Sequence, residues 1–444
     1  MTGSIQPFPI SNRELIEALR ETRERTLELI GDLTDEQLMG PRLPIVNPLR
    51  WEIGHIAWFQ EYWVLRHLGG LQAMLAQGDS LYDSARVPHD KRWDLPLPSR
   101  AETVEYMSRV LERVCDLDDR RLREPIDGYD ERYFLHLVLF HEQMHAEAIT
   151  YTRQTLCYPR PHLSISSDIG SPARGALISG DAHIPGGTFA LGASWGAAFQ
   201  FDNEAPSHDV YVSPFAVSKT AVTNGEFAAF VEDDGYATPD LWSDEGWRWK
   251  QAAEADHPVY WRPQSNGWLR RNFNEWAPLD ERIAVIHVNW FEADAYCRWA
   301  GRRLPTEAEW EMAASCELSS DGHSISSHKR RYPWGDDPPT PERANLDWRR
   351  LGCIEAEALP ESDSCFGCRQ MIGNVWEWTT TAFGGYPGFA PGPYKEYSEP
   401  WFGNHKVLRG GCWATRSRMI RSAYRNFYTP DRRDVLAGFR TCAA

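Results

Sequence analysis

The sequence predicts an α+β protein in two parts, an N-terminal bundle of four helices and a larger, irregular C-terminal domain. Long amphipathic stretches fill residues 1–160, whereas short alternating strands with frequent Gly and Pro fill residues 184–444. Residues 161–183 are rich in Ser and Gly without periodicity, which predicts a linker. The 444 residues are enough for two hydrophobic cores.

Each predicted helix has a start signal. Ser11 can cap the first, and Pro48 suits the first turn of the second because proline loses no helical hydrogen bond there. Ser99 and Glu102 have the spacing of a capping box at the start of the third. Four long amphipathic helices are typical of a bundle. The predicted ranges are 12–33, 48–69, 99–122 and 130–157.

The C-terminal part has a different character. The run 209–213 alternates apolar and polar residues as a strand does. Only two stretches are expected to be helical, 224–233 and 291–300 continued by 306–314. The remainder is punctuated by Gly and Pro, which predicts short strands joined by many turns.

Composition excludes several classes of partner. The chain has 47 Lys+Arg against 63 Asp+Glu and a formal charge of −16, which argues against nucleic acid and anionic membrane surfaces. The sequence contains no apolar run of about 18 residues, so no membrane span is expected, and the N-terminus does not resemble a secretory signal. Nine scattered cysteines, Cys365 and Cys368 among them, are expected to be free thiols of a cytoplasmic protein.

The strongest chemical feature is the string His141-Glu-Gln-Met-His145. Residues four apart share one helix face, so both imidazoles can reach one metal ion, and His55 on another bundle helix can supply a third. Such a set suits Fe(II), zinc or copper. The same string occurs in zinc proteases, where the glutamate is a general base. The apolar run before His141 instead indicates a buried bundle helix, with Glu142 behind the ligands or at the surface.

The C-terminal part carries a set of specific motifs. The motifs are Arg303-Leu-Pro-Thr-Glu-Ala-Glu-Trp310, Gly373-Asn-Val-Trp-Glu-Trp378, Val407-Leu-Arg-Gly-Gly411 and Gly438-Phe-Arg440. On these motifs this part resembles the formylglycine-generating-enzyme/sulfatase-modifying-factor domain, whose irregular α+β fold is related to C-type lectins. The helical part resembles the DinB-like four-helix bundle.

The two domains in this order resemble the ergothioneine-type sulfoxide synthases. That resemblance implies a non-haem Fe(II) enzyme that uses O2 to join a sulfur donor to the imidazole C2 of hercynine. It also implies that His55, His141 and His145 hold the iron. Formylglycine-generating enzymes need a cysteine pair where this chain has Thr415 and Ile420, which argues against that activity.

The resemblance also implies substrate contacts. Tyr394 aligns best with the active-site tyrosine of the family, a proton donor, and Tyr397 is the reserve candidate. Aromatic faces bind trimethylammonium groups through cation–π attraction. The candidates for that contact are Trp58, Phe427 and Tyr428.

Departures from the family pattern concern the donor. Met144 replaces a glutamine of the common metal motif, and Phe427-Tyr428 stands where an acidic residue recognises γ-glutamylcysteine. Arg92 can retain one contact to a donor carboxylate. The stretch from His145 to Leu156, with Trp58-Phe59 after His55, resembles the selenoneine synthase branch, which uses hercynine and a selenosugar.

Three other functions stay open at this point. A hercynine sulfoxide synthase that uses cysteine or γ-glutamylcysteine is the closest alternative to the selenoneine synthase. A DinB-like zinc thiol transferase or hydrolase is the second alternative, since the same histidines suit zinc. A binding module without chemistry is the third, since lectin-like folds often only bind ligands.

Overall fold

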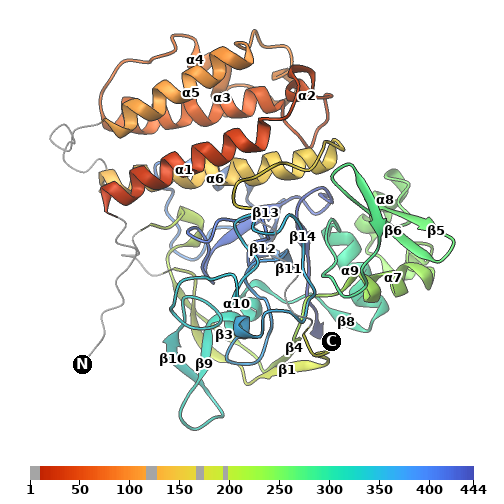
Figure 1. Ribbon diagram of the computed structural model, residues 1–444. Helices are drawn as coiled ribbons and strands as arrows, with labels where there is room; N and C mark the ends of the chain where they lie inside the picture. Colours follow the sequence, from red (N-terminus) through yellow and green to blue (C-terminus); the bar gives the residue numbers. More distant parts are fainter. Residues whose placement is uncertain (1–10, 117–127, 167–174, 194–198) are drawn as a thin grey trace. The chain divides into compact units, whose positions relative to one another are not determined.

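The computed structural model describes residues 11–116, 128–166, 175–193 and 199–444 (Figure 1). The chain forms two compact units: residues 1–164 with 196–199, and residues 165–195 with 200–444. The first unit is helical and the second combines small sheets with short helices. The predicted α+β class is confirmed.

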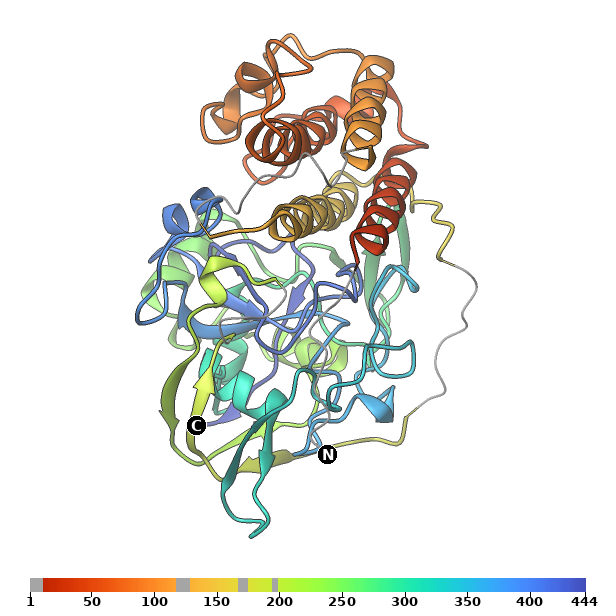
Figure 2. The same ribbon diagram turned by 90° about the vertical axis from the view of Figure 1, so that its left-hand side faces the viewer.

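Four long helices make up the first unit. Helix α1 contacts α6 along its length, and α3 contacts α5, as Figures 1 and 2 both show. The predicted caps are present, since the Ser11 and Ser99 side chains accept from backbone N–H groups three residues later. The bounds are α1 Asn12–Ile30, α3 Leu49–Gln60, α5 Arg100–Cys115 and α6 Glu131–Thr155.

Several helix boundaries differ from the predicted ones. Helix α1 ends at Ile30, three residues early. The second predicted helix changes at Glu61 into a π-helix, η1 (Glu61–Leu68), whose wider turns the hydrophobic period does not reveal. Helix α5 ends at Cys115, and the predicted end at 122 lies outside the described residues. Short helices that the sequence did not indicate are α2 (Asp35–Met39), α4 (Gly78–Tyr82) and η2 (His89–Lys91).

Two four-stranded sheets form the centre of the second unit. One has the order β1-β4-β15-β8 and the other β13-β12-β11-β14, in which β14 is parallel to β11. Their strands are β1 Asp181–Ile184, β4 Phe215–Ser218, β8 Arg302–Arg303, β11 Trp376–Ala382, β12 Lys406–Arg409, β13 Arg425–Tyr428, β14 Ala437–Gly438 and β15 Cys442–Ala443.

Smaller sheets complete this unit. The predicted strand 209–213 is β3, which pairs with β2 in antiparallel register from Gly187↔Val212 to Leu191↔His208. The bounds are β2 Gly187–Leu191, β3 His208–Val212, β5 Trp261–Gln264, β6 Gly267–Asn272, β7 Glu275–Pro278, β9 Cys316–Leu318 and β10 Ile325–Lys329.

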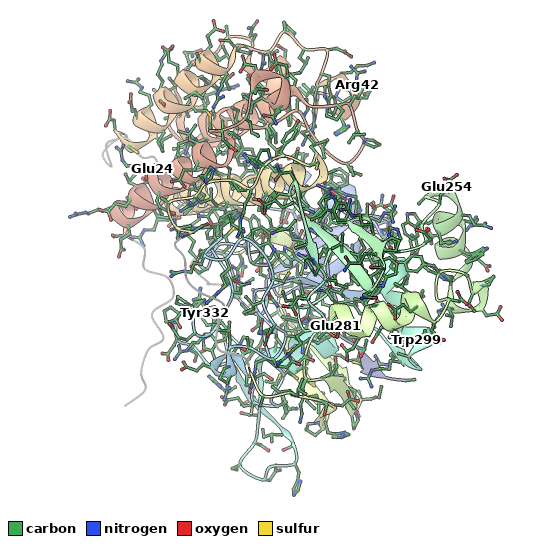
Figure 3. The ribbon with its side chains drawn as sticks, turned by 45° about the vertical axis from the view of Figure 1, so that its right-hand side comes forward. Glu24, Arg42, Glu254, Glu281, Trp299 and Tyr332 are labelled. Carbon is green, nitrogen blue, oxygen red and sulfur yellow. The ribbon has the colours of Figure 1, made fainter. Side chains whose placement is uncertain are left out.

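Four α-helices lie among these strands where two stretches were expected. The helices are α7 Asn224–Glu232, α8 Asp244–Ala252, α9 Trp290–Trp299 and α10 Glu307–Ser315. Helix α8 was not predicted, because its tryptophans are only partly buried and form no apolar stripe. Strand β8 separates α9 from α10. The indole of Trp299, labelled in Figure 3, donates to Asp233 over 2.8 Å at the end of α9.

The charged residues of the C-terminal motifs form buried ion pairs. Glu307 accepts from Arg409 over 2.7 Å and from Arg425 over 2.7 Å. Glu377 accepts from Arg440 and from the Trp310 indole, each over 2.6 Å. These side chains are almost fully buried, so the motifs hold the core of this unit together. Breaking one such pair leaves a buried charge uncompensated.

In the described part of the chain, no helix combines the length and apolarity needed to cross a bilayer. All nine cysteines are free thiols, Cys365 and Cys368 included.

Candidate metal centre

Three imidazoles meet inside the helical unit. The Nε2 atom of His141 lies 3.2 Å from Nε2 of His55 and 3.2 Å from Nε2 of His145. The ligand atoms of the three residues all lie within 4.8 Å of one another. Among the described residues, this is the one group of three or more metal-ligating side chains.

Helix geometry explains this convergence. His141 and His145 are one turn apart on α6, so their rings point from the same face. His55 lies in the middle of α3, which contacts α6. Two neighbouring helices therefore supply the three rings. His55 and His141 are each 2 % exposed, and the His145 side chain is 20 % exposed, so the group opens to solvent beside His145.

The spacing fits a divalent metal ion. With metal–nitrogen bonds of about 2.1 Å, nitrogens 3.2 Å apart subtend an angle of about 100° at the metal. That angle lies between the ideal octahedral and tetrahedral values. Three protein ligands on one side leave coordination positions for small molecules, as in catalytic rather than structural sites. The donor set therefore fits a catalytic metal.

Two of the rings have their outer nitrogen anchored. His55 Nδ1 lies 2.7 Å from the backbone carbonyl oxygen of Tyr82, and His145 Nδ1 lies 2.8 Å from Oε1 of Glu52. If each Nδ1 carries the proton, each Nε2 presents its lone pair to the metal. Gly54 allows the Tyr82 contact, because a Cβ there would lie 2.3 Å from the Tyr82 ring.

Burial also keeps two ligands neutral. Desolvation, followed by the neighbouring His145 ring, lowers the pKa of His55 and of His141 well below the usual value. A neutral imidazole is the form that binds a metal. These two rings are therefore available as ligands at neutral pH.

Glu142 does not face the rings. Its carboxylate accepts from Arg23 Nε over 2.8 Å, from Arg23 Nη2 over 3.1 Å and from the Thr26 hydroxyl over 2.9 Å. Arg23 and Thr26 belong to α1, so Glu142 links α6 to α1. Of the two predicted positions for Glu142, behind the histidines or at the surface, this contact agrees with the first. A general base of the zinc-protease kind would have to reach a metal-bound water instead.

Aromatic side chains enclose His55 and His141. The Trp51 ring stacks on His55 with centroids 4.8 Å apart, and Trp58 lies 5.9 Å from the same ring. Phe59 lies flat on His141 at 3.6 Å. The Trp58 indole donates to Asp79 over 2.8 Å, and Asp79 also pairs with Arg66. Trp58 and Phe59 thus lie beside the rings of the candidate ligands, and their contact with substrate stays a prediction.

Arg92 and Met144 are the other two predicted contacts in this unit. The Arg92 guanidinium lies 3.8 Å above the Trp51 ring and donates to Asn47 over 2.6 Å. Met144 lies on α6 directly before His145 and is partly buried. The structure thus places Arg92 against Trp51, the ring that stacks on His55. Both residues remain predicted substrate contacts.

The remaining predicted residues lie together in the C-terminal unit. The rings of Tyr394 and Tyr397 are stacked 5.9 Å apart, and Tyr397 lies 5.4 Å from Phe427. Phe427 in turn stacks on Phe383 at 3.9 Å. Tyr428 follows on β13 and carries the Arg432 guanidinium 5.3 Å above its ring.

The two tyrosines differ in their surroundings. Burial, followed by the Glu204 carboxylate, raises the pKa of Tyr397 above its usual value. Tyr397 therefore keeps its proton at any physiological pH. Tyr394 is the residue before the short helix η7 (Lys395–Tyr397) and is partly buried. Both tyrosines stay candidates for the active-site proton donor.

Known protein families match both parts of the chain. The sulfatase-modifying factor enzyme 1-like domain matches residues 171–444, and the DinB superfamily matches residues 18–149. The hercynine oxygenase of Mycolicibacterium thermoresistibile is 36% identical over 99% of this chain and 96% of that protein. The hercynine oxygenase of Mycobacterium tuberculosis is 36% identical over 95% of this chain and 96% of that protein.

The chain belongs to the hercynine oxygenase family. The predicted resemblance to ergothioneine-type sulfoxide synthases is thereby confirmed at the level of the family, as is the prediction of an enzyme of the oxidoreductase class. The formylglycine-generating enzyme of Streptomyces coelicolor is 33% identical over 64% of the chain. PvdO from Pseudomonas aeruginosa, a solved structure, is 22% identical over 59% of the chain with a TM-score of 0.40.

The sequence did not reveal the two groups that orient the histidine rings, the Glu52 carboxylate and the Tyr82 carbonyl. Glu52 lies within the string Trp51-Glu-Ile-Gly-His55, so it was visible, but its partner His145 lies on another helix. The Tyr82 carbonyl left no signal, because any residue has one. Gly54 was the available clue, since a glycine inside a buried helix often marks a close approach.

Proposed function

We propose that the chain is a non-haem Fe(II), O2-dependent enzyme that forms a carbon–chalcogen bond at the imidazole C2 of hercynine. The observation that carries the proposal is the convergence of three Nε2 atoms in a chain that aligns over nearly its whole length with hercynine oxygenases. Iron is preferred over zinc because the reaction of those relatives, as their name says, is an oxygenation. The formal charge of −16 and the nine free thiols favour a cytoplasmic enzyme that acts on small molecules.

The overall reaction balances with one O2. A thiol or selenol R–XH and the imidazole C–H each lose hydrogen, the C–X bond and an X=O bond form, and the second oxygen atom leaves as water. Four electrons pass to O2, two from C–X bond formation and two from oxidation of the chalcogen. Bound iron supplies the redox chemistry of this exchange.

The side chains of this chain supply binding and proton positions. His55, His141 and His145 would hold the iron, with neutral rings favoured by burial. Trp58 offers an aromatic face to the trimethylammonium group, with Phe427 and Tyr428 as further candidates. Tyr394 or Tyr397 would donate a proton, and the raised pKa of Tyr397 keeps its hydroxyl protonated.

For the donor, we infer a selenosugar in place of cysteine or γ-glutamylcysteine. A sugar has neither carboxylate nor amine, so it needs no charged partner. The positions that would recognise an amino group hold Phe427 and Tyr428, and Arg92 already contacts Asn47 and Trp51. A thiol-using hercynine sulfoxide synthase is the alternative. Against a zinc hydrolase stands Glu142, whose carboxylate is engaged by Arg23 and Thr26.

The first experiment tests metal and oxygen together. Chain loaded anaerobically with Fe(II) is mixed with hercynine and each donor, and product is measured before and after O2 is admitted. Product is expected only after O2, and only with iron. His141→Ala should abolish turnover by removing the central ligand. Equal turnover by zinc-loaded protein without O2 uptake would exclude the proposal and favour a DinB-like zinc transferase or hydrolase.

The second experiment tests the donor. Cysteine, γ-glutamylcysteine and a 1-selenosugar compete at equal concentration in one reaction, and the adducts are separated by mass. The selenosugar adduct is expected to dominate. A cysteine-derived sulfoxide as the main product would instead assign the chain to the sulfur branch.

A further inference from the structure

The His145 ring differs from the other two rings in its freedom to turn. Its side chain is 20 % exposed, whereas His55 and His141 are each 2 % exposed and stacked against Trp51 and Phe59. A half-turn of an imidazole ring about its Cβ–Cγ bond puts Cδ2 where Nδ1 was and Cε1 where Nε2 was, which would take the ligand nitrogen away from the metal. An anchor on the outer nitrogen prevents that turn.

Glu52 is that anchor. Its Oε1 lies 2.8 Å from Nδ1 of His145, and the residue is 1 % exposed. Across the part of the chain that the structure describes, His145 is the one hydrogen-bond or ion-pair partner given to this carboxylate. A buried carboxylate is costly unless it has a partner of complementary charge, and a single ring N–H compensates it only in part.

A bound dication would complete the charge balance. Three neutral imidazoles around it would leave two positive charges in a buried place, and the Glu52 carboxylate would offset one of them. Two other buried acids of these helices are already engaged. Glu142 pairs with Arg23, and Glu61 accepts from the Tyr106 hydroxyl over 2.7 Å and the Met74 backbone N–H over 3.1 Å.

We propose that Glu52 is a positioning residue of the metal centre, which fixes His145 with Nε2 toward the metal and supplies the counter-charge of the bound dication. This inference rests on the proposed metal site but goes beyond it, because it concerns a residue that does not touch the metal. Carboxylate partners of this kind raise the donor strength of a ligand imidazole. The Tyr82 carbonyl gives His55 an orienting contact without a charge. The charge-bearing contact is therefore specific to His145.

The test measures metal affinity of the full-length apoprotein by competition with a coloured chelator, using Fe(II) under anaerobic conditions and Zn(II) in air. Glu52→Ala removes both the acceptor and the charge, and its affinity is expected to fall about 10- to 100-fold. Glu52→Gln keeps an acceptor oxygen without the charge and should lose less. Glu52→Asp restores the charge on a shorter side chain and should recover part of the Ala loss.

Glu61→Gln is the matched control. It also removes a buried carboxylate from the same continuous helix, but its contacts are with Tyr106, Met74 and Arg66. Its metal affinity should equal that of the wild type. A ring N–H proton of His145 that exchanges slowly in the proton NMR spectrum of the wild-type apoprotein should exchange fast in Glu52→Ala. That readout needs neither metal nor turnover.

The outcomes separate the inference from the proposed function. Wild-type affinity in folded Glu52→Ala and Glu52→Gln would overturn the role of Glu52 while leaving the metal site intact. An equal loss in Glu61→Gln would overturn it too, because any buried carboxylate would then matter. If Glu52→Ala does not fold, Glu52→Gln alone decides. A wild-type chain that binds neither metal would overturn the proposed function and the inference with it.

Discussion

The buried pair between Arg23 and Glu142 allows a sharp test of how the His-Glu-x-x-His string works in this chain. The substitution is Glu142→Gln, which keeps the shape of the side chain and removes its charge. In the structure Glu142 accepts three hydrogen bonds, two from Arg23 and one from Thr26. Arg23 is 3 % exposed and would remain as a buried cation with no counter-charge, because its remaining acceptors, the new amide oxygen and the Met107 and Gln60 oxygens, are all neutral.

The expected magnitude follows from that burial. Removing one partner of a buried ion pair costs about 3–5 kcal/mol. Since about 1.4 kcal/mol is a factor of ten in an equilibrium constant, opening of the contact between α1 and α6 should become roughly 100- to several thousand-fold more frequent. Metal affinity per folded molecule should stay within about threefold of the wild type, because Glu142 contacts none of the three ligand rings.

Amide hydrogen exchange followed by mass spectrometry measures this opening for peptides of α1 and α6 in the full-length protein. Peptides of the C-terminal unit in the same sample are the internal control and should be unchanged. A double variant, Arg23→Met with Glu142→Leu, removes both charges and should recover much of the lost protection. Unchanged exchange together with abolished turnover would refute the reasoning and make Glu142 a participant in the chemistry.

Three further predictions concern the site. Because burial lowers the pKa of His55 and His141, only the unfolded chain takes up their protons just below pH 6.5; the free energy of unfolding of the apoprotein, measured from urea curves, should therefore fall from pH 7.5 to 5.5, by up to about 1.4 kcal/mol per histidine and pH unit, and a flat profile would contradict this. Asp79→Asn weakens the anchor of Trp58, so KM for hercynine should rise several-fold with metal affinity unchanged, whereas a pure kcat effect would argue against a substrate wall. Of Tyr394→Phe and Tyr397→Phe, the variant lacking the proton donor should lose about 10²- to 10⁴-fold in kcat while the other keeps most activity, and two unimpaired variants would exclude both residues.

The helical bundle could be predicted because its signals are local in the sequence. The capping side chains of Ser11 and Ser99 act on backbone groups three residues away, so the start of each helix can be inferred without knowing its neighbours. The pair His141 and His145 is equally local, because helix geometry alone puts both on one face. His55 required the further expectation that two bundle helices pack side by side.

The parts that escaped prediction depend on contacts between distant residues. Glu52 was visible beside His55, yet its partner is 93 positions away on α6. The change to a π-helix at Glu61 places that carboxylate against Tyr106, and no hydrophobic period reports it. In the second unit the motif residues Glu307 and Arg409 were recognised as family signatures, but their burial as an ion pair emerges only from the folded chain.

The two anchors behind the ligand rings differ in how they respond to evolutionary change. His55 depends on a main-chain carbonyl at Tyr82, which persists through almost any substitution at that position. His145 depends on the carboxylate of Glu52, which a single nucleotide change can remove or neutralise. The contact that orients His55 therefore survives most substitutions, whereas the contact that orients His145 does not. A single substitution at position 52 would thus change the orientation and the charge balance of the centre without altering any of the three histidines.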